Sequence, residues 1–365
     1  MIQEIFESPQ AVRDTATGRV NPTTGRVTLE GVNLHAEDFH RIKKIRVAAS
    51  GTSRHAGIAG RYMIQELAGI PVDVEHASEF EYGNPITGPE ELTIVITQSG
   101  ETADTLGALR LAKSHGSKTL AISNVADSTI TREADEVIHT KAGAEISIAS
   151  TKAFSAQLAA LFLLGVYLGE ATETLTQNQS LYWTSELLKM PEKIQMVLAC
   201  DEHCSQLADR YYKCEDFLFI ARGVHFPIAL DGALKMKETS YIHAEGYPAG
   251  EIKHGPYALI DEKLPVVAIV TRDVNDEGSV ARTERTIANC KDVKQHGGHV
   301  IAVATESDNE IEEYADHVVY VPQAPELLSP LLEIVPLQLL AYHVAVRRGV
   351  DVDRPRNLVK SVTTE

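Results

Sequence analysis

The sequence has few cysteines, one tryptophan and no long apolar run. Four cysteines in 365 residues are too few for a disulfide framework. The most apolar stretch, Leu158 to Leu168, is too short to span a bilayer. The first five residues, Met-Ile-Gln-Glu-Ile, lack the basic, apolar and small-residue regions of a secretory signal. We therefore expect a cytoplasmic protein with free thiols.

Positive charge is also scarce. The chain has 34 basic and 51 acidic residues, a net charge of −17. This balance argues against a nucleic acid or an anionic membrane as a partner. An anion can still bind at a local site made of backbone amides and a few placed side chains.

Metal ligands occur in one short cluster, Cys200-Asp201-Glu202-His203-Cys204. It could form half of a metal site, but no second cluster follows at a suitable spacing. We expect no metal and no cofactor.

What the sequence does contain is a repeated α/β pattern. Its length suits two domains, and short apolar runs alternate with helical patterns, as in parallel α/β proteins. The predicted strands are Ile45–Ala49, Leu92–Thr97, Thr119–Ser123 and Glu136–Thr140, followed by Phe217–Ala221, Pro265–Thr271, His299–Ala304 and His317–Val321.

The two strand series match each other. Lys-Ser-His-Gly-Ser-Lys at 113–118 corresponds to Lys-Gln-His-Gly-Gly-His at 294–299, and each segment precedes a strand. Ala-Asp-Glu-Val at 134–137 then matches Ala-Asp-His-Val at 315–318 in the same register. We infer two copies of one nucleotide-fold-like lobe. The expected segments are a lead-in at 1–35, a first lobe at 36–175, a helical connector at 176–206, a second lobe at 207–348 and an extended tail at 349–365.

The segment Thr97-Gln98-Ser99-Gly100-Glu101-Thr102 lies between a predicted strand and a predicted helix. Hydroxyls and free amides at a helix N-terminus form an anion site. The alternative is an ordinary helix cap. Four side chains that can donate hydrogen bonds within six residues exceed what capping needs, so the pattern favours phosphate.

Two other loops carry hydroxyls. Ser50-Gly51-Thr52-Ser53 follows the first strand, and Ala-Ser-Thr-Lys at 149–152 opens a helical run. Each could bond sugar oxygens, while a tight turn or a helix cap remains an equal alternative.

The second lobe carries titratable candidates. Lys235 and Glu238 share a face of a predicted helix, where the plain alternative is an exposed ion pair. His254, between Lys253 and Gly-Pro, falls in a turn, where an imidazole can titrate near neutral pH.

Taken in order, these motifs carry a resemblance. Ser-Gly-Thr-Ser, Thr-Gln-Ser-Gly-Glu-Thr-Ala-Asp-Thr, Ala-Ser-Thr-Lys-Ala-Phe, Ala-Leu-Lys-Met-Lys-Glu, His-Ala-Glu-Gly-Tyr and Lys-His-Gly-Pro precede the final Asp-Arg-Pro-Arg-Asn-Leu-Val-Lys-Ser-Val-Thr-Thr-Glu. Together they resemble the isomerase half of glucosamine-6-phosphate synthases (glutamine–fructose-6-phosphate aminotransferases). The resemblance covers nearly the whole chain. It implies an α/β fold of two tandem sugar-isomerase (SIS) domains, each a parallel sheet flanked by helices, and a C-terminal tail.

The resemblance also implies a role for each matching residue. Phosphate would be held by Thr97, Gln98, Ser99 and Thr102. The sugar would contact Ser50, Gly51, Thr52, Ser53, Ile148, Ser150 and Val359. His254 would open the sugar ring, reaching into a neighbouring subunit's site in a homodimer. Glu238, assisted by Lys235, would move a proton between C1 and C2, and Lys360 would form an imine with the ketone.

The reaction needs these residue types. Ring opening requires an acid–base group. Imine formation requires a neutral amine, and a lysine with the reference pKa of ~10.4 is almost fully charged at pH 7. Burial or a nearby cation such as Arg356 or Lys235 would lower that pKa. A mobile tail carrying Lys360 would act as a lid.

Two departures from the family stand out. Ser50 replaces a frequent cysteine and Thr97 a frequent serine. The chain also starts without a glutaminase segment, so we expect ammonia, or a separate or excised glutaminase, to supply nitrogen. The expected reaction is conversion of fructose 6-phosphate to glucosamine 6-phosphate, or to glucose 6-phosphate without ammonia. The alternatives are a glucosamine-6-phosphate deaminase or deglycase, and a non-catalytic SIS regulator that binds a phosphosugar.

Overall fold

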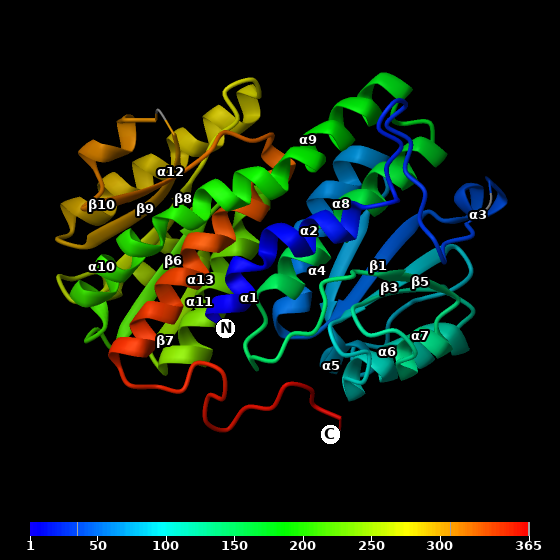
Figure 1. The fold of residues 1–365 in the computed structure, drawn as a ribbon, viewed down its shortest axis with the longest axis horizontal. Helices are drawn as coiled ribbons and strands as arrows, with labels where there is room; N and C mark the ends of the chain where they lie inside the picture. Colours follow the sequence, from blue (N-terminus) through cyan, green and yellow to red (C-terminus); the bar gives the residue numbers. More distant parts are fainter. Residues whose placement is uncertain (35, 307, 364–365) are drawn as a thin grey trace. The chain divides into compact units, whose positions relative to one another are not determined.

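The computed structural model describes residues 1–34, 36–306 and 308–363. The chain divides into two compact units, and each contains one sheet of five strands (Figure 1). The first-lobe unit holds Glu7–Glu145, Lys152–Pro191 and 359–363. The second-lobe unit holds Met1–Phe6, Ile146–Thr151 and Glu192–Leu358.

The first-lobe sheet has the order β2-β1-β3-β4-β5, and its neighbouring strands are parallel. Its strands are β1 (Lys44–Ala49), β2 (Val72–His76), β3 (Glu91–Thr97), β4 (Lys118–Ser123) and β5 (Glu136–His139). The helices are α2 (Ser8–Ala16), α3 (Ala36–Arg41), α4 (Gly51–Ala68), α5 (Ala77–Phe80), α6 (Ala103–Ser114), α7 (Thr129–Glu133) and α8 (Lys152–Ala171), after which α9 runs from Gln177 to Val197.

The second-lobe sheet has the order β10-β9-β8-β6-β7 and is also parallel. Its strands are β6 (Asp216–Ala221), β7 (His243–Pro248), β8 (Pro265–Val270), β9 (His299–Thr305) and β10 (His317–Val321). The α-helices are α1 (Ile2–Phe6), α10 (Asp201–Tyr211), α11 (Phe226–Ser240), α12 (Glu277–Gln295) and α13 (Pro330–Arg347). Short 3₁₀ helices are η1 (Leu198–Cys200), η2 (Gly223–His225), η3 (Glu251–His254), η4 (Pro256–Leu259), η5 (Glu310–Glu313) and η6 (Glu326–Leu328).

The predicted internal repeat is confirmed by topology and by contacts. Read from the opposite edge, the second sheet has the order β7-β6-β8-β9-β10, which matches the first strand for strand. The matched aspartates make the same bond: Asp135 accepts from the amide of Thr119 at 2.9 Å, and Asp316 accepts from that of Val300 at 2.8 Å. All eight predicted strands are present within one residue of the predicted ends, and β2 and β7 are additional.

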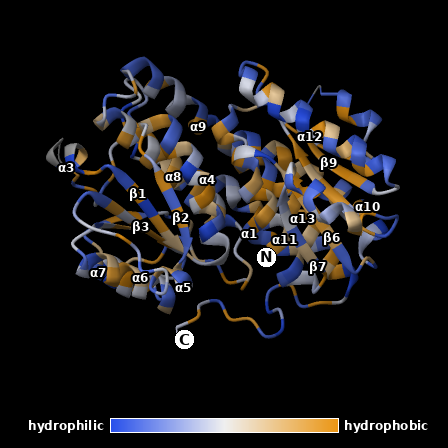
Figure 2. Cartoon of the chain, turned by 180° about the vertical axis from the view of Figure 1, so that it is seen from behind, coloured by the Kyte–Doolittle hydropathy of each residue, from blue (hydrophilic) through white to orange (hydrophobic). Residues whose placement is uncertain are grey.

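Helices cover both faces of each sheet, as buried parallel strands require. In the first-lobe unit, α5, α6 and α7 pack on the face of Ala48, Val95 and Ala121. On the other face, α4 packs so closely that a Cβ at Gly57 would lie 2.8 Å from Val47. β3 and β9 carry mainly hydrophobic residues (Figure 2).

Helices α8 and α13 are central to the two cores. By length and composition alone, Lys152–Ala171 and Glu326–Arg347 could each cross a membrane, but 89% of each apolar window is buried inside the fold. Both helices carry apolar residues on all sides, because each one packs inside the core of its unit rather than along the surface.

A buried charge network lies at the carboxyl ends of β6 and β8. His225 Nδ1 lies 2.6 Å from Glu333 Oε1, and its Nε2 lies 3.1 Å from Glu326 Oε1. The Thr271 hydroxyl also donates to Glu333, and Arg282 pairs with Glu326. Burial opposes the charged imidazole, but the two carboxylates outweigh burial and raise the pKa of His225 to about 9.

We expect this network to make stability depend on pH above neutrality. Because the folded pKa of His225 lies above its ordinary 6.5, the stabilisation is complete below pH 6.5 and is lost as pH rises through 9. In urea titrations, the free energy of unfolding should fall by roughly 3 kcal/mol more across this range in the wild type than in His225→Gln. His243→Gln, at an exposed imidazole, is the control. Equal pH dependence in the wild type and His225→Gln would contradict the assignment.

Candidate functional site

In the loop after β3, residues 97–102, the side chain at the N-cap position does not cap the helix that follows. Thr102 is the N-cap of α6, yet its side chain makes no capping bond; its hydroxyl lies 3.3 Å from that of Thr97. The Thr97 hydroxyl accepts from the amide of Gly100 at 3.2 Å, and that of Ser99 accepts from the amide of Glu101 at 3.2 Å. The Thr102 side chain therefore does not cap α6, contrary to the capping alternative.

Gly100 gives this loop its shape. Its φ is +73°, and a Cβ there would lie 2.0 Å from the Ser128 hydroxyl oxygen. The Glu101 carboxylate accepts from the Thr129 amide at 2.7 Å, at the start of α7. This backbone bond lowers the pKa of Glu101, so the one acidic group of the loop is an anion with its own partner.

The loop after β1 lies beside the loop after β3, because β1 and β3 are adjacent and parallel. The chain passes from β1 to β2 on one side and returns to β3 on the other, so this is the switch point of the sheet, where ligands bind in such folds. Ser50 is the N-cap of α4 and makes no side-chain capping bond. Ser53 accepts from Gln157 of α8 at 3.0 Å, and a Cβ at Gly51 would meet open space.

Three tail residues belong to the same unit. Lys360 Nζ lies 2.6 Å from Glu145 Oε2, and the other oxygen of this fully buried carboxylate accepts from the amide of Ala153. The hydroxyls of Ser361 and Ser99 lie 2.9 Å apart. The Val362 carbonyl accepts from the amide of Ala103 at 3.0 Å. Lys360 thus belongs to the unit that carries the loops at 50–53 and 97–102, although Ser99 and Ser361 lie 262 positions apart in the sequence.

The second-lobe unit carries the predicted Lys235–Glu238 pair on α11. Lys235 Nζ lies 2.6 Å from Glu238 Oε2, with the lysine side chain fully buried and the glutamate 22% exposed. The predicted shared helix face is confirmed, but the exposed ion pair is excluded. A lysine out of water is costly unless it is paired, so this pair is not a solvated surface contact.

The remaining predicted residues have separate settings. His254 is exposed at the end of η3, directly before Gly255, as expected for a turn. The Ile148 amide donates to the Asp353 carbonyl at 3.1 Å, and Ser150 is partly exposed in the same unit. In the first-lobe unit, Gln98 is half-buried and Val359 is 63% exposed. The structure therefore joins Thr97, Ser99, Thr102 and Lys360 in one unit, and Lys235 and Glu238 in the other.

Sequence reasoning missed Glu145, Ser361 and Gln157. Glu145 is the one acidic residue in the loop from Lys141 to Thr151, which was its available signal. The two cations predicted to lie near Lys360 have other partners. The Arg356 guanidinium stacks on the Tyr241 ring at 4.2 Å, and Lys235 pairs with Glu238.

Within residues 1–34, 36–306 and 308–363, no group of three His, Cys, Asp or Glu side chains could hold a metal ion. The sulfurs of Cys200 and Cys204 lie 3.8 Å apart, and both thiols are free.

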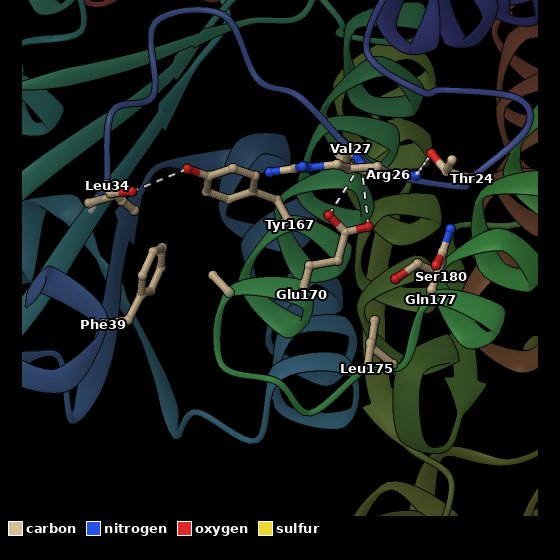
Figure 3. A pocket seen from close by; sticks show the side chains of 11 residues that line it. Thr24, Arg26, Val27, Leu34, Phe39, Tyr167, Glu170, Leu175, Gln177 and Ser180 are labelled. Atoms are coloured by element: carbon tan, nitrogen blue, oxygen red, sulfur yellow. Dashed lines mark hydrogen bonds between the residues drawn. The ribbon is translucent and has the colours of Figure 1, made fainter. Parts of the chain in front are cut away.

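A separate cavity of about 570 Å³ lies in the first-lobe unit, and Figure 3 shows its lining. Its polar groups largely serve the fold: the Glu170 carboxylate accepts from the Val27 amide, and the Tyr167 hydroxyl donates to the Leu34 carbonyl. Burial raises the pKa of Glu170. No predicted site residue lines this cavity.

The SIS domain family model matches residues 38–167 and 210–348. Glutamine–fructose-6-phosphate aminotransferase (isomerizing) of Chlorobaculum tepidum is 48% identical over the whole chain. The chain spans only 58% of that relative's length.

Solved structures give the same assignment. The C-terminal domain of glucosamine-fructose-6-phosphate aminotransferase from Francisella tularensis is 37% identical, with a TM-score of 0.89 and 97% of each chain covered. Glucosamine-6-phosphate deaminase from Thermotoga maritima, at 20% identity and a TM-score of 0.73 with 99% and 98% covered, shares the fold. The chain belongs to the SIS-domain family, together with the C-terminal domains of glucosamine-fructose-6-phosphate aminotransferases.

Proposed function

We propose that the chain converts fructose 6-phosphate to glucosamine 6-phosphate when ammonia is supplied, and to glucose 6-phosphate without it. One observation carries the proposal: the tail that holds Lys360 is anchored to the loop at 97–102 through the 2.9 Å contact of Ser361 with Ser99. In this loop, called the hydroxyl loop below, the Thr102 side chain does not cap α6. A phosphate in the loop and an amine next to it suit a phosphorylated carbonyl compound. The 37% identity with the Francisella tularensis domain supports the same substrate class.

Binding is divided between phosphate and sugar contacts. The hydroxyls of Thr97, Ser99 and Thr102 donate to the phosphate, together with Gln98. The proposed sugar contacts are Ser50, Gly51, Thr52, Ser53, Ile148, Ser150 and Val359. Among these, Ser53 is held by Gln157, which fixes the direction of its hydroxyl.

Ring opening is assigned to His254. Its ring is exposed on a 3₁₀ turn, where it can meet a group outside its own subunit. We place it in the neighbouring subunit's site within a homodimer. Without this step the closed ring offers no ketone to an amine.

The amine of Lys360 attacks C2 of the open ketose, and water leaves as the imine forms. Because the amino-sugar product carries nitrogen on C2, ammonia then displaces the lysine from that carbon. Glu238 takes a proton from C1 and returns it to C2, which leaves an aldehyde at C1 and the amine at C2. Lys235, 2.6 Å from Glu238, holds that carboxylate in place.

The same residues serve the reverse reaction, so deamination is an outcome that the assay has to measure. The nitrogen source is ammonia, free or released by a glutaminase. We assign the lobes to 36–175 and 207–348, joined through 176–206, and place the protein in the cytoplasm, consistent with its buried apolar helices and its acidic charge.

We expect the double variant Ser99→Ala, Thr102→Ala to raise the KM for fructose 6-phosphate by at least about 100-fold. Each lost hydrogen bond to a charged group costs roughly 1.5–3 kcal/mol. Steady-state kinetics and direct binding of fructose 6-phosphate measure the effect. Ser114→Ala, at the far end of α6, is the matched control and should leave KM unchanged. Normal binding in the double variant would remove the loop as the phosphate site.

Lys360 should be labelled when borohydride is added with fructose 6-phosphate, as peptide mass spectrometry can show. Removing residues 360–365 should abolish the adduct and lower turnover by orders of magnitude while the protein stays folded. Glu238→Gln should retain the adduct but lose turnover, because it stops proton transfer after the imine forms. Lys43→Ala, at an exposed pair with Glu90, is the control.

The same samples test direction: sugar phosphates are identified with and without ammonium, and with glucosamine 6-phosphate alone. An unlabelled Lys360 and near-normal turnover after truncation would retire the imine.

A further inference from the structure

Three successive tail residues are each fixed to a different part of the first-lobe unit. Lys360 pairs with Glu145, Ser361 with Ser99, and the Val362 carbonyl with the amide of Ala103. The last two contacts fall on the hydroxyl loop and on the first residue of α6. The tail therefore touches the part of the molecule that is built for an anion.

Apolar packing contributes little to this arrangement. Residues 350–363 form no helix or strand, and Leu358, Val359 and Val362 are 40%, 63% and 53% exposed. The position of the Lys360 backbone therefore depends mainly on polar contacts on either side of it. Among these contacts, that of Ser361 involves a side chain of the loop at 97–102.

The number of donors and acceptors on Ser99 determines which serine donates the hydrogen bond in that contact. A serine hydroxyl has one hydrogen to donate and two lone pairs. The Ser99 hydroxyl already accepts from the Glu101 amide, and in its contact with Ser361 either oxygen can be the donor. When the Ser99 hydrogen points to an anion, Ser361 has to be the donor. A chain then runs from Ser361 through Ser99 to the anion, and hydrogen bonds in such chains strengthen one another.

We propose that Ser361 is a positioning residue that couples occupancy of the phosphate loop to the placement of Lys360. An anion in the loop orients the Ser99 hydroxyl, which strengthens the bond from Ser361 and fixes the adjacent lysine against the substrate carbonyl. The proposal rests on the proposed function above. It follows that the phosphate group raises the rate of imine formation as well as the affinity, because part of its binding energy positions the amine.

The test supplies the sugar and the phosphate group as two separate molecules. Fructose, which has no phosphate, is incubated with borohydride in the presence or absence of phosphite dianion, and labelling of Lys360 is followed by mass spectrometry. In the wild type, phosphite should raise the labelling rate at least about tenfold. In Ser361→Ala this stimulation should fall below about twofold, while phosphite binding by thermal shift changes less than about threefold. Ser361→Thr, which keeps the hydroxyl, should recover the stimulation.

Two further variants separate coupling from damage to the tail. Thr363→Ala, at an exposed position of the same tail, should respond to phosphite like the wild type. In a Ser99→Ala background, Ser361→Ala should add no further loss, because the contact through which it acts is already gone.

The outcomes distinguish the two proposals. Full phosphite stimulation in Ser361→Ala would overturn the coupling alone. If fructose 6-phosphate itself fails to label Lys360 in the wild type, the proposed function fails and the coupling falls with it. Wild-type labelling of fructose that does not respond to phosphite also overturns the coupling, whatever the variants show.

Discussion

The parallel pairing of β1 with β3 is the constraint on which the first-lobe site depends. Parallel strands end at the same edge, so the loops at 50–53 and 97–102 emerge side by side at the switch point. Gly100 can turn sharply there, and Ser128 leaves no room for a side chain at that position. The hydroxyls of Thr97 and Ser99 accept hydrogen bonds from loop amides, which fixes the orientation of both side chains.

Buried charge sets a second constraint. In a chain of net charge −17, the Lys235 side chain is fully buried, and the Glu145 carboxylate accepts hydrogen bonds from Lys360 and from a backbone amide. A buried ion pair adds little net stability over apolar residues of similar size, whereas removing one partner is costly. Such pairs are poor choices for packing alone. Lys235 lies beside Glu238, whose side chain is 22% exposed, and Glu145 lies beside the tail residue Lys360.

The sequence was informative where structure is local. Eight strands read as apolar runs and were predicted to within one residue, and the loop at 97–102 was placed correctly between β3 and α6. The two missed strands lie at sheet edges: β2 alternates Val and acidic residues, and β7 contains a glycine and ends in a proline. The other two edge strands, β5 and β10, were predicted, so the obstacle in β2 and β7 is their composition, because acidic residues, glycine and proline are depleted in strands. Contacts such as Lys360 with Glu145, 215 residues apart, leave no periodic trace in the sequence.

The two lobes share one topology but treat their corresponding helix N-termini differently. In the second lobe, Asp276 caps α12 and accepts from the amides of Gly278 and Ser279, and the Glu326 carboxylate accepts from the Ser279 hydroxyl. In the first lobe, Thr102 occupies the N-cap of α6 without a capping bond. The start of α12 is thus capped by a carboxylate of the chain itself, whereas the N-cap hydroxyl of α6 lies 3.3 Å from that of Thr97. A carboxylate at an N-cap neutralises the partial positive charge of the helix start, and a hydroxyl does not, so the duplicated fold offers an external anion different settings at its two corresponding caps.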